Sequence, residues 1–508
     1  MTVLDYLVIA LYAVGMLAVG KYYARRAKTS DDYLLGGRKM SPFMIGISLF
    51  ATITSTLSYL AYPGEMIRHG PMLFAQLAAF PAVFFIVGWG LIPWIMGQKV
   101  TSGYELLEAR LGMTGRLIGS GMFVTLRMFW MASILYATST AVLIPLLEID
   151  PEQAYLWAPI LSTVMGTLTL IYTAEGGMRA VVMTDALQSF IMFAGGILIV
   201  IVVSVTLGGV GAWWPTTWER HWDPPVFWFD ASARTTFMGA FLNMLVWMTC
   251  TAGSDQMALQ RYLATRDAPA ARRSFGVHLV AELILSLLLA LVGLAVLGYF
   301  MHYPELLQIG ESVNSTADKL LPRFIVIGLP MGITGLVIAA MLSAAMSSLS
   351  SGMNSSSAVI TRDFIARFRR LETAATTEQP EKPALTQAQQ VRLERTVSVV
   401  IGVIAILLST VVGSLAGNLI ELCFKVVNLL TAPLFVLFFL ALFVKWSTPL
   451  GAVAATVASV SVAVGIAFFG LFGLSQLLWT APCALVAGVL AGMIFSPLGK
   501  SARPPAAG

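Results

Sequence analysis

The segment MLSAAMSSLSSGMNSSSAVITRD, residues 341–363, decides the fold because it carries eight serines between Ser343 and Ser357. The residues just before it, GLPMGITGLVIAA (328–340), read as the start of a membrane span. Hydroxyl groups are costly in hydrocarbon unless they find partners. We therefore expect a helix that crosses a bilayer and turns a polar stripe towards the protein interior.

The composition supports a membrane protein. Of 508 residues, 57% are apolar and only 11% are charged, whereas soluble domains average about 25% charged residues. The apolar runs are about 20 residues long, which fits helices and excludes the short alternating strands of an outer-membrane barrel. The three cysteines lie in apolar segments, so no disulfide framework is indicated. The fold class is an all-α polytopic membrane protein.

The hydropathy pattern predicts about thirteen transmembrane helices. Their expected ranges are 3–23, 42–67, 71–97, 116–147, 154–173, 180–209, 235–260, 275–301, 324–357, 396–416, 420–444, 449–472 and 475–496.

Basic residues give the orientation. The segment KYYARRAKTSDDYLLGGRKM (21–40) holds six Lys and Arg residues. If it is cytoplasmic, alternation puts about 24 basic residues inside and about 5 outside, in agreement with the positive-inside rule. We expect an outside N-terminus and a cytoplasmic C-terminus in the cell membrane, and a disordered tail at 497–508.

The second span, SPFMIGISLFATITSTLSYLAYPGE (41–65), is rich in hydroxyls at its centre. Serine and threonine compete for backbone hydrogen bonds and weaken a helix. An unwound segment would free carbonyl oxygens, which is tolerable at membrane depth only beside a cavity or an ion. The alternative is that each hydroxyl bonds back to its own or a neighbouring helix.

In the ninth span, Ala344, Ser347, Ser348, Ser351 and Ser355 fall on one helical stripe about 100° wide. Such a stripe serves either helix packing or the binding of a hard cation such as sodium. In YTAEGGMRAVVMTDALQSF (172–190), Asp185 lies just inside an apolar run. It faces water or a cation there, or it pairs with Arg179.

Five segments together resemble the sodium:solute symporter family, which includes sodium-coupled transporters of sugars, proline, iodide, monocarboxylates and sialic acid. They occur in the family's order and at its spacing. The segments are SLFATITSTLSYLAYPGE (48–65), TSGYELLEARLG (101–112), YTAEGGMRAVVMTDALQS (172–189), GSDQMALQRYLATRDAPAARRS (253–274) and GLVIAAMLSAAMSSLSSGMNSSSAVITRD (335–363).

The resemblance implies a LeuT-like core of two five-helix inverted repeats. Spans two to six (42–209) would form the first repeat and spans seven to eleven (235–444) the second. The first span (1–23) and the last two (449–496) would be peripheral.

The resemblance also implies sodium as the coupling ion, at one or two sites. The first site would be formed by Ala51, Thr54, Ala344, Ser347 and Ser348. A second site, found in some members, would use Asp185, Ser347, Ser350 and Ser351.

The solute is expected at the midplane between the repeats. The predicted lining residues are Ser55, Ser58, Gln76, Arg127, Trp130, Asn243, Trp247, Thr251, Lys425 and Asn428. The chain departs from known subfamilies here. Trp130 stands where sialic-acid transporters have an arginine, Ser58 stands near a glutamine position of the bacterial galactose transporter, and Asp255 replaces the usual asparagine.

Arg127 and Lys425 favour an anionic solute such as a carboxylate, because a buried cation needs a partner. Their structural alternatives are an i,i+4 pair of Lys425 with Glu421, and snorkelling or carbonyl capping by Arg127. A sugar or polyol is then the alternative solute.

The predicted function is sodium-driven symport of a small polar organic solute into the cell by alternating access. A proton-coupled transporter of the same fold is the rival, although the neutral serines argue against it. We find no motif of an enzyme or a channel, and expect no nucleic-acid or protein partner beside the solute, sodium and the lipid bilayer.

Overall fold

The computed structural model describes residues 1–24, 28–98, 100–230, 233–367, 385–415 and 419–500, and the side chains of Pro151, 413–415 and 419–428 lie outside that description. All regular elements in these ranges are helical. The first helices are α1 (Val3–Ala24), α2 (Ser30–Leu35), α3 (Pro42–Ile53), α4 (Thr56–His69), α5 (Phe80–Phe85), α6 (Ile92–Met96), α7 (Glu105–Ala137), α8 (Ile144–Leu146) and α9 (Ala154–Leu207). The remaining helices are α10 (Phe237–Ser254), α11 (Gln256–Leu263), α12 (Ala268–His302), α13 (Ala317–Ile327), α14 (Ile333–Val359), α16 (Gln387–Leu415), α17 (Leu419–Phe443), α18 (Pro449–Phe469) and α19 (Gln476–Phe495).

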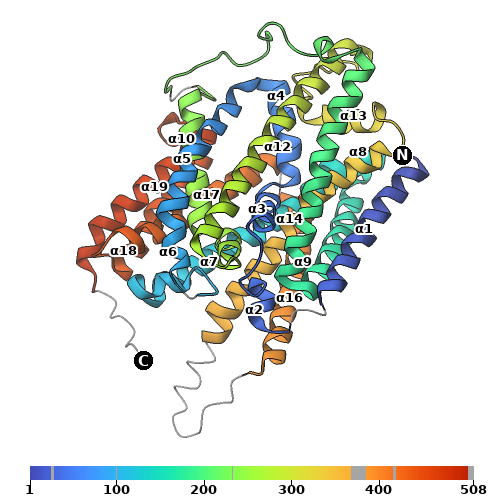
Figure 1. Cartoon of the computed structure of the whole chain (residues 1–508). Helices are drawn as coiled ribbons and strands as arrows, with labels where there is room; N and C mark the ends of the chain where they lie inside the picture. Colours follow the sequence, from blue (N-terminus) through green and yellow to red (C-terminus); the bar gives the residue numbers. More distant parts are fainter. Residues whose placement is uncertain (25–27, 99, 231–232, 368–384, 416–418, 501–508) are drawn as a thin grey trace.

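Within the described ranges, ten helices are long and apolar enough to cross a membrane, and the bent pair α3–α4 makes an eleventh span. The count of about thirteen stays a prediction. The 54-residue helix α9 covers two predicted spans, and its chain turns at Gly177, whose φ of 59° suits glycine. α1 lies at one side of the bundle, and α18 and α19 lie at the other (Figure 1).

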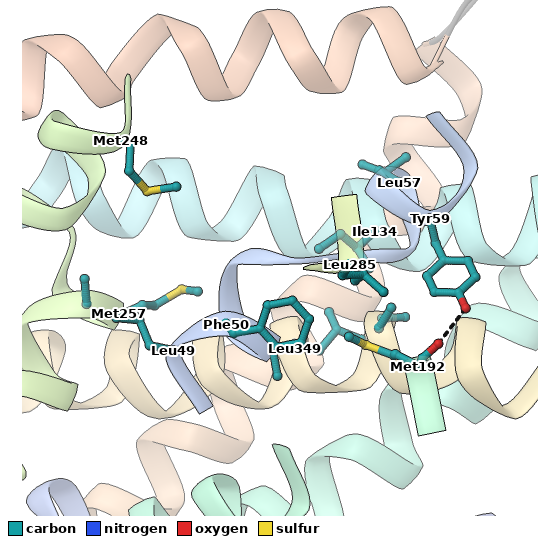
Figure 2. Packing of buried hydrophobic residues seen from close by; sticks show 14 of the residues in the cluster. Leu49, Phe50, Leu57, Tyr59, Ile134, Met192, Met248, Met257, Leu285 and Leu349 are labelled. Carbon is teal, nitrogen blue, oxygen red and sulfur yellow. Dashed lines mark hydrogen bonds between the residues drawn. The ribbon is translucent and has the colours of Figure 1, made fainter. Parts of the chain in front are cut away.

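The second span is interrupted at its centre. α3 ends at Ile53, Thr54 and Ser55 are extended, and α4 begins at Thr56 after a bend of 67°. Figure 2 shows Leu49 and Phe50 before the interruption and Leu57 and Tyr59 after it. The Tyr59 hydroxyl donates a hydrogen bond to the Met192 carbonyl at 2.7 Å, which anchors α4 to α9.

The seventh span is also interrupted, which the sequence did not predict. The predicted span 235–260 divides into α10 and α11 at Asp255, whose side chain caps α11 by accepting a hydrogen bond from the Met257 backbone N–H at 2.9 Å. The predicted start of the ninth span is wrong as well. Residues 324–327 belong to α13, and α14 begins at Ile333, because Gly328, Pro330 and the positive φ of Gly332 end one helix before the next.

α14 lies at the centre of the bundle, and every residue from Val337 to Val359 is buried. It packs against α9, α1, α7 and α3. The α1 carboxylate Asp5 accepts hydrogen bonds from the backbone N–H groups of Gly332 (2.8 Å) and Gly335 (2.9 Å) at the start of α14. Gly335 permits this contact, since a Cβ there would lie 2.6 Å from the Asp5 carbonyl oxygen.

Candidate functional site

The serine stripe of α14 faces the interruption between α3 and α4. The Ser347 hydroxyl donates to the Ala51 carbonyl at 2.8 Å and lies 3.2 Å from the Ala344 carbonyl. The Ser348 hydroxyl lies 3.1 Å from the carbonyl oxygens of both Thr52 and Thr54. These carbonyls are free because the helix ends there. The structure thus brings the five predicted ligands of the first sodium site together.

Thr52 belongs to the same oxygen cluster but was missed from the sequence. Its carbonyl accepts from Ser348, and its hydroxyl bonds the Ser48 carbonyl at 2.6 Å. The density of hydroxyls in the second span was the available signal, and it did not reveal which carbonyl the interruption would free. Neutral hydroxyl and carbonyl oxygens are the ligand type that hard cations prefer.

The residues predicted for a second site form a connected network one turn further along α14. The Ser350 hydroxyl donates to the Ser347 carbonyl at 3.0 Å, and the hydroxyls of Ser351 and Thr52 are 2.9 Å apart. Asp185 is fully buried, and one of its oxygens, Oδ1, has no hydrogen-bond partner in the described part of the chain.

The partner of Asp185 is Arg261, not the neighbouring Arg179. Arg261, on α11, is buried and lies 3.1 Å from Asp185 Oδ2. It also donates to Ser351 Oγ at 2.5 Å and to Ser48 Oγ at 2.9 Å. The Arg179 interpretation was wrong, because Arg179 pairs with Asp32 on α2 at 3.2 Å. Arg179 is closer to Asp185 in the sequence, but the residue that pairs with Asp185 comes from the second interrupted span.

A cavity of about 550 Å³ lies beside these networks. It is lined by seven of the ten residues predicted to contact the solute: Ser58, Gln76, Arg127, Trp130, Asn243, Trp247 and Thr251. Ser55 is not in its lining, and the Ser55 hydroxyl is buried without a partner among the described residues. Lys425 and Asn428 lie outside the described side chains.

Arg127 is not free in this cavity. Its guanidinium forms a buried ion pair with Asp255, the residue at the interruption of the seventh span. Neither snorkelling nor carbonyl capping describes Arg127 in the structure. The pair links α7 to the junction of α10 and α11 directly at the cavity wall.

Glu282 and Tyr62 are among the lining residues that were missed from the sequence. Glu282, on α12, receives a hydrogen bond from the Thr54 hydroxyl at 2.9 Å. Tyr62 lies on α4, and its hydroxyl accepts a hydrogen bond from Gln76 Nε2 at 3.4 Å. The signal for Glu282 was available, because an acidic residue stands alone in the apolar run HLVAELILSLLLALVGL (278–294).

Ion pairs gather where the C-terminal end of α4 borders the cavity. At the α4 end, ion pairs join Arg234 to Glu65 (2.6 Å) and Arg68 to Asp318 (2.9 Å). Trp222, in the loop between α9 and α10, donates a hydrogen bond to the Ile67 carbonyl at 3.2 Å. The four charged residues of these ion pairs line the cavity, and the side chains of Arg68 and Arg234 are 33% and 39% exposed, so the mouth of the cavity lies here.

Just beyond the C-terminal end of α14, in the segment Ile360–Ile365, Asp363 is the centre of a charged hydrogen-bond network. This carboxylate accepts hydrogen bonds from Ser102 (2.6 Å), Ser120 (2.9 Å) and Arg116 (2.5 Å). Arg116 also pairs with Glu108 at 2.6 Å. The network ties the end of α14 to the start of α7.

Comparisons with known proteins agree with this geometry. A model of the sodium:solute symporter family matches residues 33–459. The chain is 28% identical to the sodium/sialic acid symporter SiaT of Proteus mirabilis, over 97% of this chain and 96% of the relative. It is 29% identical to the sodium-coupled monocarboxylate transporter 1 of Xenopus laevis, over 89% and 70% of the two chains.

Solved structures give the same picture. A sodium-coupled sialic acid symporter, in a substrate-bound outward-open state, is similar with a TM-score of 0.83 and 26% identity, covering 99% of this chain and all of the other. A nucleobase-cation-symport-1 family transporter shares the fold alone, with a TM-score of 0.58 and 13% identity. The fold is LeuT-like and the coupling ion is sodium. The chain is a multi-pass membrane protein that belongs to the sodium:solute symporter family, and it carries a small organic solute together with sodium.

Proposed function

We propose that the first sodium ion binds where the serine stripe of α14 meets the freed carbonyls of α3. The observation that carries this proposal is the cluster of neutral oxygens around Ser347 and Ser348, within 2.8–3.2 Å of the carbonyls of Ala51, Thr52, Thr54 and Ala344. Neutral ligands bind sodium without trapping it. The ion holds α3 and α14 together and so orders the interrupted helix.

A second sodium ion would bind at Asp185, Ser347, Ser350 and Ser351. Support comes from the buried Oδ1 atom of Asp185, which has no partner among the described residues. Arg261 occupies the other carboxylate oxygen and keeps the site close to neutral. Oδ1 is therefore the oxygen through which Asp185 would coordinate the ion.

The proposed solute is a small organic carboxylate held in the 550 Å³ cavity. Arg127 supports this choice, because a guanidinium has several N–H donors and Asp255 engages only one of its nitrogens. Relatives named for sialic acid and for monocarboxylates also carry acids. A sugar or polyol is the second choice, favoured by the polar but uncharged Ser58, Gln76 and Asn243 in the lining.

Alternating access is the proposed mechanism, in the cell membrane, with the N-terminus outside and the C-terminus in the cytoplasm. The repeats 42–209 and 235–444 would each begin with an interrupted span, and 1–23 and 449–496 would be peripheral. The mouth at the α4 end would face outward. Opening inward would require the Asp363 network to break, while the membrane potential contributes about 2.3 kcal/mol per charge per 100 mV to uptake.

The protein would act as a transporter only, within the lipid bilayer, without a chemical reaction or a protein partner of its own. Coupling to protons alone would need an ionisable group in place of Ser347 and Ser348. Sodium-free uptake driven by a pH gradient would therefore contradict the sodium proposal.

A thermal-shift titration of the purified protein with sodium tests this function, with potassium at equal ionic strength as the control. A ligand that binds only the folded state raises its stability by mass action. We expect sodium to stabilise the protein, and carboxylates to add stability only when sodium is present. Equal shifts with sodium and potassium would contradict the proposal.

A further inference from the structure

Glu282 is a carboxylate at the wall of the solute cavity that the sodium sites do not use. It lies on α12, it is 8% exposed, and its Oε2 atom receives the Thr54 hydroxyl at 2.9 Å. A carboxylate at membrane depth is costly unless a cation or several donors face it. Within the described ranges, no basic side chain forms an ion pair with it.

The other charged residues of the cavity wall are all paired. Arg127 pairs with Asp255. Arg234 pairs with Glu65, and Arg68 pairs with Asp318. His69 lies 3.1 Å from Asp223. Among the described lining residues, Glu282 is therefore the one carboxyl group that no basic side chain pairs.

Aromatic rings gather around the same space. Tyr62, Trp130 and Trp247 line the cavity with Glu282. A carboxylate combined with aromatic faces suits a positively charged nitrogen, because the ring quadrupole attracts cations. Sodium does not need Glu282, because its proposed ligands are other carbonyl and hydroxyl oxygens. Thr54 separates the two sites, since its carbonyl faces Ser348 and its hydroxyl faces Glu282.

We propose that Glu282 binds a positively charged amino group of the solute, so that the solute is a zwitterion rather than a simple anion. This inference rests on the proposed function and narrows its substrate class. The ammonium group meets Glu282 and the aromatic rings, and the carboxylate meets the remaining N–H groups of Arg127. Thr54 then touches both partners of symport, since its carbonyl belongs to the sodium cluster and its hydroxyl to Glu282.

Matched acids with and without an amino group test this inference. We would measure thermal shifts of the purified protein in sodium with 4-aminobutyrate against butyrate, and with β-alanine against propionate. At least one amino acid of these pairs should stabilise the protein at concentrations where its amine-free partner does not. Equal shifts within both pairs, or no shift with either amino acid while sodium itself stabilises the protein, would overturn the inference.

The variant Glu282→Gln separates recognition from folding. It keeps an acceptor for Thr54 but removes the charge, so affinity for the amino acid should fall about tenfold to a hundredfold. Its sodium-induced shift should stay. Glu311→Gln, which changes a carboxylate that is paired with Arg323 outside the cavity lining, is the matched control and should keep amino-acid binding.

Two other results have distinct meanings. If wild type shows no sodium-induced shift at all, the proposed function fails first. If Glu282→Gln removes a proton dependence of uptake but leaves the preference for amino acids unchanged, Glu282 handles a proton and the amino-group inference is wrong.

Discussion

The two interrupted spans share the backbone dihedral angles of one residue, but different side chains meet the two interruptions. Thr54, after α3, and Asp255, between α10 and α11, both have φ −76° and ψ 124°. Each residue ends a helix inside the membrane and frees polar backbone groups there. The shared dihedral angles of one residue in the first span of each proposed repeat agree with an internal two-fold relation.

The difference lies in what meets each interruption. Neutral hydroxyls of α14 meet the carbonyls after α3, whereas the charged pair Arg127–Asp255 stands at the junction of α10 and α11. Neutral oxygens suit a small ion that must be released, and charged groups suit recognition of a larger solute. The backbone interruption provides the opening, and the neighbouring side chains determine what each opening binds.

The largest expected effect is a loss of folding stability when the Arg127–Asp255 ion pair is broken. Arg127→Gln leaves Asp255 as a buried, unpaired carboxylate, which costs about 3–5 kcal/mol of folding stability. Thermal unfolding of the purified protein measures it. The double variant Arg127→Gln/Asp255→Asn should recover most of that stability while solute binding stays lost. A double variant as unstable as the single one would show that the pair is not the cause.

Changes at the interruption between α3 and α4 should lower the affinity for sodium rather than the folding stability. Ser348→Ala removes the hydroxyl shared by the Thr52 and Thr54 carbonyls. We expect sodium affinity to fall about tenfold to a hundredfold, measured by the sodium-induced thermal shift. Ser356→Ala is the control, because its hydroxyl lies on the same helix, buried and without a partner among the described residues. Equal losses in both variants would argue against a specific site.

Ser350→Ala tests whether a second ion is coupled. It removes one proposed ligand of the second site and leaves Ser348 and the carbonyl cluster intact. The half-saturating sodium concentration for uptake should rise about threefold to tenfold, and the Hill slope should fall from near two to near one. A slope near one in wild type, unchanged in Asp185→Asn, would exclude the second coupled ion.

The smallest effect should come from a charge far from both interruptions. Glu311, in the loop before α13, receives hydrogen bonds from Arg323 (2.6 Å and 3.2 Å), which lower the pKa of its carboxyl. Its contribution is therefore present near neutral pH and is lost as the pH falls through this lowered pKa. Glu311→Gln should cost less than about 1 kcal/mol at pH 7. The thermal difference from wild type should vanish in acid, and sodium affinity should not change.

Much of this arrangement was predictable because it depends on local pattern. The hydroxyls at Thr54 and Ser55 indicated an interruption, and the helical stripe through Ser347 and Ser348 gave the face that meets it. The family resemblance supplied the pairing of these two distant segments. Periodicity alone would have left them apart.

The remaining contacts could not be predicted because they join segments that lie far apart in the sequence. Asp255 breaks its span two residues after Gly253, and its side chain caps α11. Arg261 reaches Asp185 across 76 residues, while Arg179 stood closer in sequence. Glu282 stands out in the sequence as a single acidic residue in an apolar run. Its place in the wall of the solute cavity follows only from the packing of α12 against α4.

The hydrogen bonds of Asp5 connect α1 to the start of α14, so α1 can serve as a fixed reference for measuring the motion of α4. Asp5 holds two N–H groups of the first turn of α14, so α1 should travel with the ion-binding serines. Leu11, on the exposed face of α1, can carry a distance label without touching the site. A second label on α4 would then report how far the interrupted helix separates from the sodium cluster during each cycle.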